Sequence, residues 1–240
     1  MSLFRNIVFT SVLVGLVAGT AITAVQAVGT GNLIAQAEVY ETAGEGAAHE
    51  HSSDNLSVSA VTAGEVHSHE HEGWEPANGL ERTAFTLAAN ILTAIGYSLV
   101  LVSLMVFRGS QVGWRNGILW GLAAFTCVML APMLGLPPEL PGTPSAPLAD
   151  RQMWWMATAF LTACAIALAA FQRKPWAFVV ALALVAAPHV FGAPQGPEGA
   201  HALAPKAMEQ SFVAMAVLTS LILWSMIGAL GATVYGRISR

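Results

Sequence analysis

Charged side chains are scarce in this chain of 240 residues: they make up 10% of it, against roughly 25% in ordinary soluble domains. Hydrophobic residues make up 55%. With so little charge, the chain cannot cover a water-soluble surface, which excludes an ordinary soluble domain. The charges are also clustered, so that uncharged stretches close to the roughly 20 residues needed to cross a bilayer recur along the chain. The composition therefore predicts a protein of the lipid bilayer.

Several motifs of catalysis and nucleic-acid binding are absent as well. Neither lysine, Lys174 or Lys206, follows a glycine in a phosphate-binding loop, which excludes nucleotide hydrolysis by a P-loop. The apolar stretches have no G-x-S-x-G nucleophile motif, and no basic patch suggests nucleic acid. Cys127 and Cys164 both fall inside apolar stretches, where a small buried side chain is expected and an extracellular disulfide is not. We therefore expect neither an enzyme nor a nucleic-acid-binding protein.

Six apolar stretches have about the length of a transmembrane helix. They are residues 7–27, 83–107, 117–133, 153–171, 176–191 and 212–235. The fifth is the weakest, because it is short and carries Pro188 and His189 near its end, so it is either a short tilted helix or a helix broken near the interface. The first is either an uncleaved signal anchor or a signal peptide, since small residues flank Gln26.

The distribution of charge supports six helices with both termini in the cytoplasm. In that arrangement seven of the ten basic residues fall inside and all 14 acidic residues fall outside, as the positive-inside rule predicts. Trp154 and Trp155 then lie at the outer interface, as in an aromatic belt. The sequence therefore predicts an all-α, polytopic bundle: a first transmembrane helix within residues 1–37, an external loop over 38–82, and a five-helix bundle over 83–240.

The predicted external loop contains five of the seven histidines. The loop is poor in large apolar residues, so we expect it to be largely disordered. Its imidazole groups alternate with carboxylates, and both groups bind borderline divalent ions such as Co²⁺ and Ni²⁺. The pattern fits a flexible tract that captures metal and matches no closed zinc site; the alternative is a solvated polar tract. The histidines are His49, His51, His67, His69 and His71.

A second group of candidate residues lies in or near the membrane. His189 is the only histidine within a predicted helix, and no Asp or Glu lies in any of the six stretches, so the usual carboxylate relay of a proton-coupled transporter is missing. Counting about 1.5 Å per residue places Asn90 and Met129 at a similar depth, where imidazole, amide oxygen and thioether would form a metal pathway. The alternatives are an interfacial histidine bonded to a carbonyl and an asparagine that joins two helices. Glu139, in an outer loop over 134–152 stiffened by five prolines, and His201 are further pathway candidates.

The order of several short motifs resembles the CbtA family of predicted cobalt transporter subunits over nearly the whole chain. These motifs are Gly15 with Gly19, the His/Glu loop, Leu136-Pro137-Pro138-Glu139, Arg151-Gln152-Met153-Trp154-Trp155 and Ala187-Pro188-His189. The resemblance implies cobalt uptake linked to cobalamin supply, in the bacterial inner membrane, together with a small single-span companion subunit of the CbtB type. It implies no tightly bound cofactor, since the ion is cargo. Ligand type does not separate Co²⁺ from Ni²⁺.

Two functions of different classes fit these residues. The favoured one is a transporter in which the outer loop raises the local metal concentration and His189 lies on the path. The competitor is a non-transporting membrane protein, either a metal sensor or a redox subunit that holds haem between His189 and His201. Haem between transmembrane helices usually needs two intramembrane ligands, and His201 falls in a predicted outer loop, so transport is the stronger hypothesis.

Overall fold

The computed structural model describes residues 2–53, 76–77, 79–109, 113–197, 199 and 202–239, and over 44–53 it describes the backbone alone. All the secondary structure in these residues is helical, which confirms the predicted all-α class. The elements are α1 (Ser2–Val28), α2 (Thr30–Ser53), α3 (Leu80–Phe107), α4 (Trp114–Phe125), η1 (Thr126–Leu130), α5 (Ala131–Met133), α6 (Leu148–Phe171), α7 (Pro175–Phe191) and α8 (Lys206–Ile238).

Five helical segments of the described residues are long and apolar enough to cross a membrane. They are α1, α3, the continuous run Trp114–Met133, α6 and α8. The shorter α7, with 17 residues, is the weak fifth stretch of the sequence. Many large apolar side chains face outward, among them Phe160, which is 68% exposed, and Phe191, which is 90% exposed. Such a surface is stable against lipid tails rather than water.

Helix α1 packs against α3 through glycine. A Cβ atom at Gly15 would lie 2.7 Å from the backbone nitrogen of Ile95, and one at Gly19 would lie 2.7 Å from that of Ile91. Because a Cβ atom would clash at these distances, only glycine permits this approach. Close packing at small residues is a usual way for helices to join in lipid. Because the residue number rises along α1 as it falls along α3, the two helices are antiparallel.

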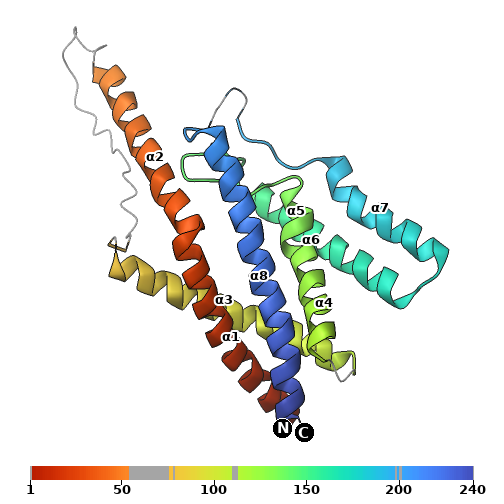
Figure 1. Cartoon of the computed structure of the whole chain (residues 1–240). Helices are drawn as coiled ribbons and strands as arrows, with labels where there is room; N and C mark the ends of the chain where they lie inside the picture. The colour runs from red at the N-terminus through yellow and green to blue at the C-terminus, as the bar shows by residue number, and fades with distance from the viewer. Residues whose placement is uncertain are drawn as a thin grey trace, which may run out of the picture.

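Helix α4 packs against α8 in the same way. Gly117 lies against Gly228, and four residues on, Gly121 lies against the backbone of Trp224. This pair is therefore antiparallel too. Figure 1 shows α1 and α8 side by side, with both chain ends at the same end of the bundle, as the six-helix topology requires. The side of the membrane on which that end lies stays a prediction.

The described core lies where α1, α3, α4 and α8 meet. Its buried apolar residues are Val14, Ala18, Ala94, Leu101, Met105, Phe125, Trp224, Ile227 and Ala232. Tyr97 on α3 stacks on Trp224 on α8, with ring centroids 4.7 Å apart. The hairpin of α6 and α7 lies to one side of this core, and α7 packs against α6 (Figure 1).

Residues 38–53, which the sequence analysis assigned to a largely disordered loop, are helical in α2. Alanine and glutamate recur in this segment, and both are good helix formers. Contacts outside the segment also hold the start of α2: Ala37 packs with Leu140 and Ala204, and Arg82 on α3 donates to Glu38 through Nη1 and Nη2 of its guanidinium group. The hydrogen bond from Arg82 lowers the pKa of the Glu38 carboxyl below its ordinary value of 4.5.

Candidate metal-handling site

His189 lies near the end of α7, next to Pro188. The residue that follows this helix is Gly192, and its φ of +85° is a backbone conformation that residues other than glycine rarely adopt. Trp154 on α6 donates its indole Nε1–H to the Pro188 carbonyl at 3.1 Å. The Trp154 and His189 rings meet edge to face, with centroids 5.6 Å apart and planes at 70°. Trp154 therefore fixes the backbone beside His189 and contacts the imidazole itself.

The imidazole of His189 has an unused nitrogen. The residue is half-buried, its Nε2 atom is buried, and Nε2 has no hydrogen-bond partner among the residues that the structure describes. Most buried polar atoms in proteins are paired, so an unpaired one calls for an explanation such as an ion or a water molecule. An imidazole nitrogen can accept a hydrogen bond or coordinate a metal. This atom is accordingly the strongest metal-ligand candidate in the described helices.

Trp154 is itself held by a close contact with the proline-rich loop over residues 134–152. A Cβ atom at Gly135, just after α5, would lie 2.8 Å from Cζ2 of Trp154 and 2.9 Å from Cβ of Ala193. The segment after α5 thus packs against both the indole of Trp154 and the segment after α7. The sequence analysis assigned Trp154 only to an interfacial belt. Its neighbour Gly135 was the available signal, because glycine often marks a close approach of backbone to a ring.

The proline-rich loop is pinned to the start of α6. Arg151 donates to Glu139 at 2.7 Å and to Ser145 at 2.9 Å, and the side chains of Arg151 and Glu139 are only 28% and 26% exposed. The Glu139 carboxylate is therefore already paired with a cation. The geometry gives Glu139 a role in fixing the proline-rich loop and leaves it less available as a metal ligand.

Asn90 joins two helices. Its side-chain amide donates to Thr23 Oγ1 at 2.9 Å and to Gln26 Oε1 at 2.6 Å, both on α1. This is the helix-joining alternative that the sequence left open. Met129 lies in η1, a short stretch of π-helix, and packs against the core. His189 lies on α7, which packs against α6, so these three side chains do not come together as one ligand set.

The described residues contain no group of three or more His, Cys, Asp or Glu side chains that could hold a metal ion. The histidines of the predicted capture loop are not covered by this statement, because their side chains are not among those described. The backbone of His49 and His51 is part of α2. Four other histidines, His67, His69, His71 and His201, lie outside the described residues.

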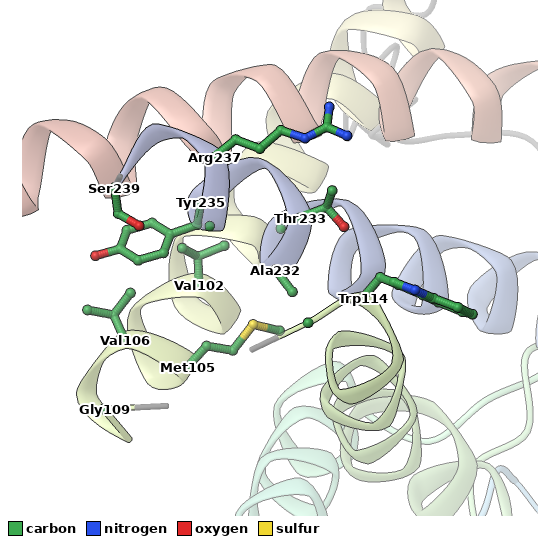
Figure 2. A pocket seen from close by; sticks show the side chains of 13 residues that line it. Val102, Met105, Val106, Gly109, Trp114, Ala232, Thr233, Tyr235, Arg237 and Ser239 are labelled. Atoms are coloured by element: carbon green, nitrogen blue, oxygen red, sulfur yellow. The ribbon is translucent and has the colours of Figure 1, made fainter. Parts of the chain in front are cut away.

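A cavity of about 600 Å³ opens at the end of the bundle that holds both chain termini, between the last turns of α3 and α8 and the start of α4. Figure 2 shows the side chain of Met105 and the ring of Tyr235, both of which line this cavity. The described residues of its lining carry arginine, thioether and hydroxyl groups, and none of them carries an imidazole, thiol or carboxylate. These groups suit a divalent ion poorly. Apart from the glycines near the end of α8, no sequence pattern indicated this cavity.

The comparison with protein families agrees with the sequence resemblance. Residues 4–236 match the family described as "Probable cobalt transporter subunit (CbtA)". Neither the curated proteins nor the solved structures contain a match. Because the match covers almost the whole chain, this protein belongs to the CbtA family of probable cobalt transporter subunits.

Proposed function

We propose that this chain forms the path by which Co²⁺ crosses the bacterial inner membrane, and that His189 is a ligand on that path. Membership of the family supports Co²⁺ as the transported ion. Ligand type does not separate Co²⁺ from Ni²⁺, so an experiment must exclude Ni²⁺ as the transported ion. The observation that carries the role of His189 is its buried, unpaired Nε2 atom. An ion that enters hydrocarbon must replace its water ligands, and imidazole does this better than thioether or hydroxyl.

The surroundings of His189 suit a group that must keep a fixed direction. Trp154 bonds to the carbonyl of Pro188 and contacts the imidazole ring. Metal-binding histidines are commonly oriented by such neighbours, and their loss lowers metal affinity or activity roughly 10–100-fold. In this proposal Trp154 is a positioning residue that acts through His189.

The outer surface supplies the ion in this proposal. The five histidines and the glutamates of the predicted external loop capture it and raise its concentration near the membrane. The outer loop that Arg151 pins to α6 lies near the His189 end of α7, because its Gly135 packs against Trp154 and Ala193. That stiff loop shapes the entrance.

A single imidazole cannot complete the coordination shell of a divalent ion. Among the side chains that the structure describes there is no further histidine and no cluster of three ligands. As a transporter subunit, the chain works with partners, and we propose that a single-span companion of the CbtB type contributes the missing ligands. This division of ligands also accounts for the lack of a carboxylate relay within the chain.

The test is uptake of radiolabelled Co²⁺ by cells that express the chain with its companion. His189→Ala should lower uptake at least about tenfold, with normal amounts in the membrane. Substitution of His201 should do less. Trp154→Phe keeps an aromatic ring but removes the pyrrole part of the indole with its N–H, and should lower uptake by a smaller factor. Trp155→Phe is the matched control, because Trp155 is the neighbouring indole. Wild-type uptake in a well-expressed His189→Ala variant would leave this histidine a packing role.

A further inference from the structure

Among the residues that the structure describes, one end of the bundle is rich in cations that have no carboxylate partner. The described basic residues at this end are Arg5, Arg108, Arg115, Arg173, Lys174 and Arg237. The described acidic residues belong to α2, to the starts of α3, α6 and α8, and to the proline-rich loop, all towards the opposite end. There, by contrast, Arg82 and Arg151 are each paired with a glutamate. The basic end must therefore draw its counter-charge from outside these residues.

Two of these arginines share one open recess. Arg108, just after α3, and Arg173, just after α6, line it together with Ala170 and Phe171 at the end of α6. The guanidinium of Arg108 lies over the ring of Phe171, 4.9 Å from its centroid. Such cation–π stacking restrains the guanidinium while leaving its N–H groups at the edge of the plane free to donate.

We propose that this recess binds the phosphate headgroup of an anionic phospholipid. The planar, five-donor guanidinium matches the geometry of phosphate, and basic pockets between transmembrane helices are a recurrent form of lipid recognition. Two of the four residues that line the recess, Ala170 and Phe171, are apolar, and Phe171 is 55% exposed. An acyl chain can lie along that surface, which a free, hydrated phosphate would not use. The exposed indoles of Trp114 and Trp176 place the membrane interface at this level.

The position of the recess gives the lipid a structural consequence. Arg108 belongs to the connection between α3 and α4, whereas Arg173 belongs to the connection between α6 and α7. A headgroup bound to both arginines joins the α6–α7 hairpin to the core of the bundle. The lipid then fixes the position of the hairpin that carries His189, although the proposal stands independently of cobalt transport.

The experiment measures lipid binding to the purified full chain by native mass spectrometry and by thermal unfolding in detergent. Phosphatidylglycerol should bind and stabilise the protein, and phosphatidylcholine should do so much less. The double variant Arg108→Gln with Arg173→Gln should weaken phosphatidylglycerol binding by more than about tenfold. Arg237→Gln is the matched control, because it removes a cation at the same end without touching the recess, and it should bind lipid as the wild type does.

Three results would overturn the proposal. Equal binding of phosphatidylglycerol to the double variant and the wild type would place the lipid elsewhere. Equal stabilisation by phosphatidylcholine would remove the role of charge. Full stabilisation by inorganic phosphate, with no further effect of the lipid, would make the recess a site for a free anion. A double variant that fails to fold in detergent is replaced by the two single variants, each of which should show part of the loss.

Discussion

Substitution of the glycines between α4 and α8 tests the packing on which the whole bundle depends. A Cβ atom at Gly117 would lie 2.7 Å from Cβ of Ala232 and 3.0 Å from the carbonyl carbon of Gly228. Carbon atoms in good contact are roughly 3.5–4.0 Å apart. Helix α8 would therefore have to move by about 1 Å. At Gly121 the obstacle is the backbone of Trp224, which cannot turn aside as a flexible side chain can.

This displacement should destabilise the protein. Overpacking costs about 1–3 kcal/mol, and the higher helix propensity of alanine offsets up to about 1 kcal/mol. With the full offset, the net loss for Gly117→Ala or Gly121→Ala is about 0–2 kcal/mol. For a chain of this size each kcal/mol lowers Tm by about 2–4 °C, so we expect a decrease of up to about 8 °C. Thermal unfolding in detergent, followed by tryptophan fluorescence, measures it, because Trp224 lies at this interface and stacks on Tyr97.

The matched control is Gly96→Ala on α3. A Cβ atom at Gly96 would have no other atom within 4 Å, so this variant should unfold at the wild-type temperature or slightly above it. If Gly117→Ala and Gly121→Ala unfold at the same temperature as Gly96→Ala, α4 and α8 do not pack through these glycines and the argument is refuted.

Three further predictions concern charge, topology and metal capture. Because the pKa of Glu38 is lowered in the folded protein, its pairing with Arg82 stabilises the fold above about pH 4.5 and is lost as the pH falls through the lowered pKa. Both side chains are more than a third exposed, so Glu38→Gln should cost at most about 1 kcal/mol at pH 7 and nothing at low pH, as measured by thermal unfolding at several pH values. Reporter fusions at Gly109 and Lys174 should be cytoplasmic, and an external reporter at Lys174 would reject the six-helix topology. A peptide over residues 45–75 should bind Co²⁺ or Ni²⁺ more strongly above about pH 6.5, because protonated imidazole does not coordinate; calorimetry that detects no binding at millimolar metal would reject a capture role.

Hydropathy and charge were sufficient to predict the helical class and the positions of the apolar helices. The pattern depends only on the local sequence, because each helix satisfies its own backbone hydrogen bonds in lipid. The same local pattern could not predict η1, since one π-helical turn does not change composition. It also misplaced the start of the loop, because α2 is held partly by Arg82, 44 residues beyond Glu38.

The candidate site was predicted less completely, for a geometric reason. Counting residues gives depth in the membrane but not the face of the helix, so Asn90 and Met129 were grouped with His189 although they lie on other helix pairs. The pairing of Glu139 with Arg151 joins a loop to a helix, and no periodicity encodes it. His189 stays a predicted ligand, chosen as the one imidazole in a predicted helix; its contact with Trp154 could not be predicted, because it depends on the packing of α6 against α7.

The central claim, that this chain carries Co²⁺ across the membrane, is tested most directly by uptake in cells. Radiolabelled Co²⁺ and Ni²⁺ are supplied at matched concentrations to cells with the chain and its companion, with either one alone, and with neither. We predict Co²⁺ accumulation when both are present, well above the level in cells with neither, and a weaker effect for Ni²⁺. Co²⁺ accumulation that is the same with and without this chain, at confirmed membrane expression, would contradict the account.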